Sequence, residues 1–226
     1  MTLADFIPVF LTVSAAGLVI SLCTEQSQIV AKTRGVFAGK IATGYMNSMR
    51  IMIINRFGSI IYIFFLGLSI DVGITNRTLL GVAIAAALGV LGYNLFLILN
   101  RGKVLKFTSD MKDERLWEFL RFGGCWYTFA SFTATLCNFL GLTLPLLLSN
   151  SFPEFRLSMA NTGFLLNAIF TMINVLVLET RYAAIVDTGT HQEAYRFSVL
   201  IFTTRALATL TAIFVFAMTW LVLPPS

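Results

Sequence analysis

Charge is scarce in this chain: Asp, Glu, Lys and Arg together make up 12% of its 226 residues, whereas 57% are hydrophobic and the mean hydropathy is +0.82. A soluble domain of this size cannot bury so much apolar surface, so the composition predicts an integral membrane protein. The chain also lacks the alternating segments of about 10 residues that are typical of a membrane β-barrel. Its apolar runs of roughly 17–25 residues instead have the length of helices that cross a bilayer.

Motifs for catalysis and for metal or nucleotide binding are also missing. The sequence has no P-loop pattern and no HExxH, so we expect neither ATP hydrolysis nor a zinc-dependent activity. The cysteines, Cys23, Cys125 and Cys137, have no CxxC spacing and indicate neither a metal site nor a disulfide framework. The only histidine, His191, falls in a polar segment, where we expect a solvated side chain rather than part of a Ser/His/Asp set. We therefore expect no enzyme activity, no metal and no cofactor.

The fold that we expect is an all-α integral membrane protein, a single polytopic transmembrane domain over residues 1–226. Its apolar runs predict about six transmembrane helices, at approximately 6–23, 51–70, 78–99, 124–148, 159–178 and 198–223. Two segments between them, 24–45 and 104–122, mix apolar with charged residues, which predicts one or two cytoplasmic interfacial helices. The 24–45 segment also fits a re-entrant helix, and both segments fit plain connectors that lie on the membrane.

The positions of the basic residues predict the orientation in the membrane. The segments 24–50, 100–121 and 179–197 hold twelve of the sixteen Lys and Arg residues, and they alternate along the chain with the remaining loops. Because basic loops stay in the cytoplasm, we expect these three segments inside and both termini outside. The same rule accounts for the net charge of +5 without nucleic acid as a partner.

Polar side chains follow one face of the second expected helix. An ideal helix turns about 100° per residue, and this angle places six polar residues on one arc: Asn47, Ser48, Asn55, Arg56, Ser59 and Tyr62. Arg50 lies outside this arc at the cytoplasmic edge, where we expect its side chain to reach the lipid headgroups. Arg56 lies deeper, on the face that carries the amides and hydroxyls. The two arginines are therefore not equivalent.

Three further spans carry polar side chains at helical spacing. They are Thr128, Ser131, Thr135 and Asn138 in the fourth span, Asn167, Thr171, Asn174 and Arg181 in the fifth, and Ser198, Arg205 and Thr209 in the sixth. Arg205 lies about 10 Å from the cytoplasmic end of its helix. Because four spans have such a face, the pattern predicts a polar cavity among the helices that opens to the cytoplasm.

Two arginines inside the membrane allow two interpretations. Arg56 and Arg205 can form internal ion pairs, and the candidate partners are Glu179, Asp187 and Asp71. Alternatively they bind an anionic headgroup, because a guanidinium group matches phosphate oxygens in a bidentate geometry. In the second interpretation nine residues are candidates for substrate binding: Arg56, Arg205, Asn47, Asn55, Ser59, Asn138, Asn167, Asn174 and Arg181.

Two stretches of the sequence carry short motifs in a fixed order. The first, residues 24–71, contains AKTRGVFAGKIA, NSMRIMIINRFGS and LGLSID, and the second, residues 152–187, is FPEFRLSMANTGFLLNAIFTMINVLVLETRYAAIVD. Together they resemble the Amj family of bacterial lipid II flippases, although the family favours Asp-Pro where this chain has Glu179 and Thr180. The resemblance implies a six-span inner-membrane protein that moves the undecaprenyl-pyrophosphate-linked peptidoglycan precursor, lipid II, from the cytoplasmic to the outer leaflet during cell-wall synthesis. It implies no catalytic residues.

Two other functions are compatible with the same residues. One is a flippase for a different lipid-linked saccharide, such as an O-antigen or teichoic acid precursor. The other is a non-transporting structural component of a cell-envelope complex, in which the buried arginines pair with acids and the interior is closed.

The expected partners are lipid II or a related lipid-linked saccharide, and membrane lipids. Because six helices are few for enclosing a large headgroup, we also expect a homodimer.

Overall fold

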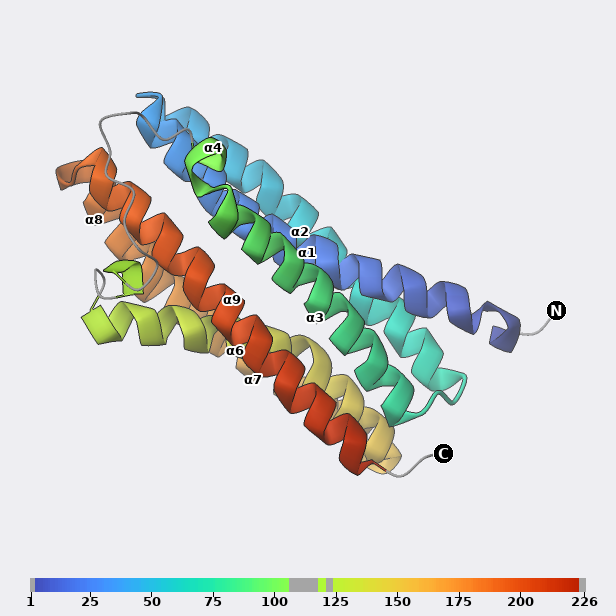
Figure 1. Ribbon diagram of the computed structural model, residues 1–226. Helices are drawn as coiled ribbons and strands as arrows, with labels where there is room; N and C mark the ends of the chain where they lie inside the picture. The colour runs from blue at the N-terminus through green and yellow to red at the C-terminus, as the bar shows by residue number, and fades with distance from the viewer. Residues whose placement is uncertain (1–2, 106–117, 121–123, 224–226) are drawn as a thin grey trace.

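The computed structural model describes residues 3–105, 118–120 and 124–223, and every element in this part of the chain is helical (Figure 1). The α-helices are α1 (Ile7–Phe37), α2 (Ile41–Asp71), α3 (Asn76–Leu99), α4 (Arg101–Val104), α6 (Gly124–Ser151), α7 (Arg156–Ile173), α8 (Thr180–Thr188) and α9 (His191–Val222). A π-helical segment, Asn174–Glu179, joins α7 to α8, and short 3-10 helices, Leu3–Phe6 and Pro153–Phe155, precede α1 and α7. Most of the predicted interfacial helix at 104–122 lies outside the described residues.

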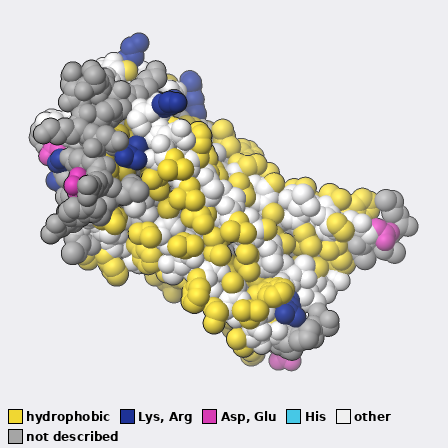
Figure 2. All heavy atoms as spheres, viewed as in Figure 1, with side chains coloured by type: hydrophobic (Ala, Val, Ile, Leu, Met, Phe, Trp, Pro, Cys, Tyr) yellow, Lys and Arg dark blue, Asp and Glu magenta, His cyan; other side chains and the backbone are white. Residues whose placement is uncertain are grey.

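Six helices within the described residues are long and apolar enough to cross a membrane. They are Ile7–Phe37, Ile41–Asp71, Asn76–Leu99, Trp126–Ser151, Asn161–Asp187 and His191–Val222. The predicted all-α membrane fold with six spans is therefore confirmed. Many large hydrophobic side chains are exposed along these helices, and Figure 2 shows them as a broad belt between the two ends of the molecule. Such a belt is unusual for a soluble protein, and in a bilayer it faces the acyl chains.

The segment 24–45, predicted as an interfacial helix, a re-entrant helix or a connector, instead belongs to two long helices. α1 continues to Phe37, a tight turn follows, and α2 begins at Ile41. The turn depends on Gly39, whose φ of 64° lies in the left-handed region that glycine reaches without strain. The prediction is wrong because polar residues do not always mark the membrane surface. The Thr33 hydroxyl, for example, lies within hydrogen-bond distance of side chains of α8 and α9 inside the bundle.

The fifth span is longer than predicted, and the expected loop at 179–197 is mostly helical. α7, the π-helical segment and α8 follow one another without a break, and only Gly189 and Thr190 separate α8 from α9. The Thr190 hydroxyl accepts a hydrogen bond from the backbone N–H of Glu193, whose carboxylate accepts one from the backbone N–H of Thr190. This capping box starts α9 at His191, which is exposed as expected but is the first helical residue rather than part of a loop.

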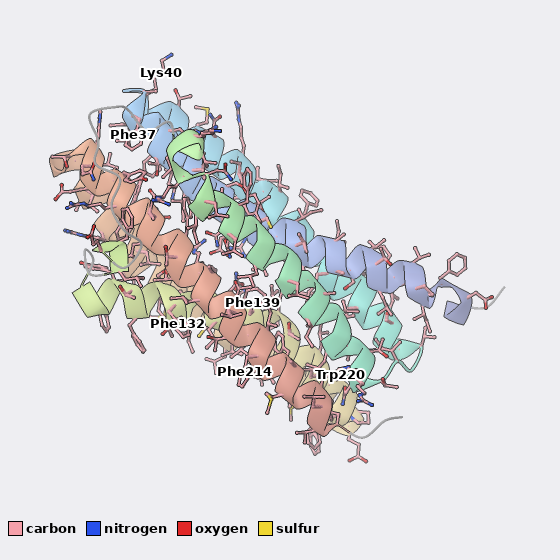
Figure 3. The ribbon with its side chains drawn as sticks, viewed as in Figure 1. Phe37, Lys40, Phe132, Phe139, Phe214 and Trp220 are labelled. Carbon is pink, nitrogen blue, oxygen red and sulfur yellow. The ribbon has the colours of Figure 1, made fainter. Side chains whose placement is uncertain are left out.

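The spans alternate in direction, so both termini lie at the same end of the bundle (Figure 1). The α1–α2 turn and α4 lie at the opposite end. Figure 3 labels Phe37 and Lys40 at that end and Trp220 at the end of the termini. In the view of Figure 2, Lys and Arg side chains gather chiefly at the end with α4. The bundle therefore has one basic end, opposite its termini.

Two helical hairpins flank the centre of the bundle. α1 packs along α2, α6 packs along α7, and the strongly buried α9 lies between them in contact with α1, α3 and α6. The backbones of α1 and α2 approach closely where glycines face each other, Gly17 opposite Gly58 and Gly35 opposite Gly44. Because α2 packs mainly on α1 and α7 packs mainly on α6, space is left between α2 and α7.

Candidate functional site

A cavity of about 260 Å³, here called the groove, lies between α2 and α7. Glu25, Asn138 and Leu142 are buried and form its base, whereas its lining residues from α2 and α7 are partly or fully exposed. Eight of the thirteen lining residues are polar or charged, so the groove is a polar site within an apolar bundle. The lining residues are Glu25, Gln28, Met52, Asn55, Arg56, Ser59, Ile60, Ile63, Asn138, Leu142, Asn167, Phe170 and Asn174.

The groove brings together six of the nine candidate substrate-binding residues. Three come from α2, and one each comes from α6, α7 and the π-helical segment. In that order they are Asn55, Arg56, Ser59, Asn138, Asn167 and Asn174. The polar faces that the sequence predicts for three of the spans therefore meet around one cavity, as the helical spacing indicates.

The groove opens at the side of the bundle among exposed residues of α2, whereas the sequence predicts an opening to the cytoplasm. Met52, Ile60 and Ile63 line the groove, and these side chains are 43%, 61% and 47% exposed. They share one face of α2 with Arg56, at spacings of three and four residues. Because large apolar side chains on this face lie against acyl chains in a bilayer, the α2 edge of the groove is apolar and its interior is polar.

Arg56 lies near the middle of α2 and level with the middle of α3. The side-chain amide of Asn55 donates a hydrogen bond to the backbone oxygen of Ser21 (2.9 Å), and Val19, two residues earlier, lies against Gly89 near the midpoint of α3. α3 has 24 residues, so at 1.5 Å per residue it is about 36 Å long, only slightly longer than a hydrocarbon core of about 30 Å. Arg56 is exposed in the groove and has no ion pair within the part of the chain that the structure describes. A cation at this depth is costly unless an anion or water meets it.

The polar groups beside Arg56 also hold α1 to α2. The hydroxyl oxygens of Ser21 and Ser59 lie 2.7 Å apart, and the Ser21 hydroxyl also donates to the Asn55 side-chain oxygen at 3.4 Å. Tyr62, which belongs to the same predicted arc, is fully buried, and its hydroxyl lies 3.3 Å from a threonine of α6. The arc is therefore divided: part of it fixes helix packing, and the part around Arg56 faces the groove.

A buried ion pair lies at the base of the groove. Arg205 Nη2 lies 2.9 Å from Glu25 Oε1, and Asn138 Nδ2 donates a hydrogen bond to Glu25 Oε2 at 2.8 Å. The Arg205 and Glu25 side chains are only 3% and 11% exposed, so each charge depends on the other for compensation. Arg205 is thus internally paired, but the three acids named from the sequence are not its partners. Its partner is an acid of α1 that sequence reasoning did not select.

A small chamber of about 20 Å³ lies behind Glu25 and is lined by the Arg205 side chain. Nε and Nη1 of Arg205 are buried without a hydrogen-bond partner among the described residues, and the chamber has room for about one water molecule. Lys32 and Glu179 also line the chamber and form a second ion pair, with Lys32 Nζ 2.5 Å from Glu179 Oε1. Glu179 is therefore paired, but with Lys32 and not with either candidate arginine.

The structure does not bring Asn47 or Arg181 to the groove, so the prediction that they share a cavity with the other candidates is wrong. Asn47 lines a separate depression near the α1–α2 turn together with the exposed Arg50. It lies about 12 Å along α2 from Asn55, a separation in depth that helical angles do not show. Arg181 lies over the ring of Tyr127, 5.6 Å from its centroid. The π-helical segment before Arg181 has more residues per turn than an α-helix, which rotates the residues after it away from the predicted face.

Sequence reasoning missed three charged or polar residues of α1 that line the groove or the chamber: Glu25, Gln28 and Lys32. Their signal was present. An acid inside a membrane helix is by itself a pointer to a functional site, and Lys32 follows Glu25 by seven residues on the same helical face. The predicted first span ends at Cys23, which places Glu25 at the membrane surface, whereas α1 continues through Glu25 to Phe37.

The arrangement offers an exposed guanidinium, several amide groups and a buried ion pair, all of which can bind anions or sugar hydroxyls. Within the described residues, no group of three His, Cys, Asp or Glu side chains is placed to hold a metal ion. Comparisons of the chain with protein-family models, with curated proteins and with solved structures gave no match.

Proposed function

We propose that this protein is a flippase that moves lipid II, the undecaprenyl-pyrophosphate-linked peptidoglycan precursor, from the cytoplasmic to the outer leaflet. The observation that carries the proposal is the position of Arg56, a cation near the middle of α2 that is exposed in the groove without an acidic partner among the described residues. A guanidinium binds phosphate oxygens in a bidentate geometry, so an anionic headgroup offsets the cost of holding Arg56 at this depth.

The two sides of the groove suit the two halves of an amphipathic lipid. The amides of Asn55, Asn138 and Asn167 can donate hydrogen bonds to sugar hydroxyls and accept them. The exposed edge formed by Met52 and Ile60 allows a polyprenyl chain to stay among the acyl chains while its head occupies the groove. The helix α2 thus contributes both to the polar subsite, through Asn55 and Arg56, and to the apolar edge, through Met52 and Ile60.

The volume of the groove sets a condition on the mechanism. At about 260 Å³ it lies just below the usual range for ligand sites, so it accommodates the pyrophosphate and its nearest atoms rather than a whole saccharide–peptide head. The larger head requires α2 and α7 to separate. Because each of these helices packs mainly on a different partner, they can separate while both hairpins stay intact, as an alternating-access cycle requires.

The resemblance to the Amj family supports lipid II as the substrate and the bacterial cytoplasmic membrane as the location. The basic end of the bundle supports an orientation with this end in the cytoplasm and both termini outside. In this orientation the groove lies between the leaflet that supplies the lipid and the leaflet that receives it.

The test is complementation. A bacterium is depleted of its own lipid II flippase, this chain is expressed, and the lipid II that becomes accessible to an extracellular probe is measured. Arg56→Ala should abolish rescue at normal expression. Arg50→Ala is the matched control, since it removes an arginine of the same helix that lies outside the groove, and it should retain rescue. A well-expressed wild-type chain that gives no rescue, or full rescue by Arg56→Ala, would overturn the proposal.

A structural component of an envelope complex is the second candidate, and the Glu25–Arg205 pair is the observation that favours it. The pair links α1 to α9 and closes the base of the groove, and a closed interior is expected of a bundle that transports nothing. In that case the wild-type chain gives no rescue, and Arg205→Ala lowers the stability of the purified protein without any transport activity to lose. The exposed Arg56 has no role in this second function.

A further inference from the structure

We propose that Glu25 is an internal counter-ion that holds Arg205 and Asn138 until an anionic phosphate headgroup enters the groove and takes over both donors. The inference rests on the proposed function and deepens it. It assigns the buried ion pair a role in binding the phosphate group of the lipid rather than in packing alone.

The position of Glu25 is the first observation. Glu25 lines both the groove and the chamber, whereas Arg205 lines only the chamber, so Glu25 stands between the groove and the second arginine. Both carboxylate oxygens are engaged, Oε1 by Arg205 and Oε2 by Asn138. A phosphate group presents the same kind of paired anionic oxygens, and it can accept from the same two donors. The carboxylate therefore occupies the place that a phosphate would take at the base of the groove.

The unused donors of Arg205 are the second, independent observation. Its side chain is 3% exposed, and Nε and Nη1 have no hydrogen-bond partner within the described part of the chain. Buried donors of this kind are normally satisfied, and a guanidinium that uses one nitrogen keeps an edge free for a bidentate acceptor. The pyrophosphate group of the proposed lipid has four non-bridging oxygens, two on each phosphorus, so it can satisfy more of these donors than the two oxygens of Glu25 do.

The charges of the site are the third observation. Arg56 and Arg205 supply two positive charges, and Glu25 removes one of them. A pyrophosphate diester carries two negative charges, so the two arginines match it only when Glu25 no longer neutralises Arg205. Lys32 lines the chamber as well, but it is already paired with Glu179, so a Glu25 carboxylate that turns out of the groove would share this cation with Glu179. Entry of the headgroup thus exchanges one buried ion pair for another.

The experiment measures binding of farnesyl pyrophosphate, a short isoprenyl pyrophosphate, to the purified full-length chain in detergent, with farnesol as the control for the apolar tail. Glu25→Gln removes the competing negative charge but keeps the shape of the side chain. It should lower the Kd for farnesyl pyrophosphate about tenfold, because like charges at close range repel. The double variant Glu25→Gln/Arg205→Gln should lose this gain, and farnesol should bind all variants equally.

Unchanged or weaker binding by folded Glu25→Gln overturns the inference, and so does a double variant that binds as tightly as Glu25→Gln. If Glu25→Gln does not fold, Glu25→Asp takes its place: the shorter side chain weakens the contact with Arg205, so the Kd should fall by a smaller factor, and an unchanged Kd is again contrary. Failure of every variant to bind the probe overturns both the inference and the phosphate site of the proposed flippase. Tighter binding by Glu25→Gln together with no rescue by the wild-type chain supports the inference and refutes the flippase.

Discussion

A single methyl group at position 58 tests the close packing that supports the groove. Gly58 of α2 faces Gly17 of α1. A Cβ added at Gly58 would lie 2.7 Å from the backbone nitrogen of Ser21 and 2.8 Å from the backbone oxygen of Gly17. Backbone atoms cannot rotate away as a flexible side chain can. The substitution Gly58→Ala therefore forces α1 and α2 apart at this level.

The expected cost follows from the contacts at this seam. Overpacking of this kind costs about 1–3 kcal/mol. Separation of the helices also weakens the Ser21–Ser59 contact of 2.7 Å and the Asn55–Ser21 bond of 2.9 Å, and such bonds contribute about 0.6 kcal/mol each inside membranes. Alanine is the better helix former by about 0.5–1 kcal/mol, which offsets part of the loss. We expect a net destabilisation of about 1–4 kcal/mol.

The measurement is unfolding of the purified protein by SDS in mixed micelles. Gly67→Ala is the matched control, because Gly67 lies in the same helix and a Cβ added there would have nothing within 4 Å. It gains the same helix propensity without a clash, so it should be neutral or slightly stabilising. Equal stability of the Gly58→Ala and Gly67→Ala variants would refute the close packing of α1 on α2. The reasoning also requires Gly58→Ala to lower rescue, since Arg56 lies on the displaced part of α2.

Two further substitutions test contacts outside the groove. Glu179→Gln leaves Lys32 beside an uncharged amide, and because the Glu179 side chain is 37% exposed we expect a loss of only about 1–2 kcal/mol in the SDS assay. The exchange Lys32→Glu with Glu179→Lys should recover part of this loss, and no recovery would contradict a direct ion pair. Arg181→Ala should keep full rescue because Arg181 lies outside the groove, and loss of rescue at normal expression would contradict its placement.

The six spans could be predicted because long apolar runs leave few alternatives. α3, predicted at 78–99 and observed at Asn76–Leu99, is the clearest case, because its run ends at polar residues on both sides. The first span is predicted at 6–23, but α1 extends to Phe37. The prediction stops early because hydropathy identifies only the part of a helix whose side chains are apolar enough to contact lipid. Beyond Cys23, α1 is covered by other helices, whose side chains satisfy its polar groups. Polar residues of this kind look like a membrane surface when the sequence is taken alone.

The candidate site could be predicted as far as helical angles determine it. Asn55, Arg56 and Ser59 lie within one turn or so of each other, so an angle of 100° per residue is enough to group them. The error at Asn47 is one of depth, since residues at the same angle can lie two turns apart. The error at Arg181 comes from the type of helix. The π-helical segment before Arg181 does not turn 100° per residue, so the angle calculated for Arg181 is wrong, and no residue pattern in the sequence indicates a π-helix there.

Glu25 accounts for the two interpretations of the arginines that the sequence left open. Its contact with Arg205 joins residues of α1 and α9 that are 180 positions apart, so no local pattern could match them. Glu25 neutralises Arg205 and not Arg56, so the two arginines have different roles. Glu179, one of the acids considered as a partner, is paired with Lys32 instead. Arg56 is then left without an acidic partner in the described part of the chain. In the proposed function a phosphate headgroup supplies the anion that offsets the cost of this cation, whereas Arg205 already has Glu25.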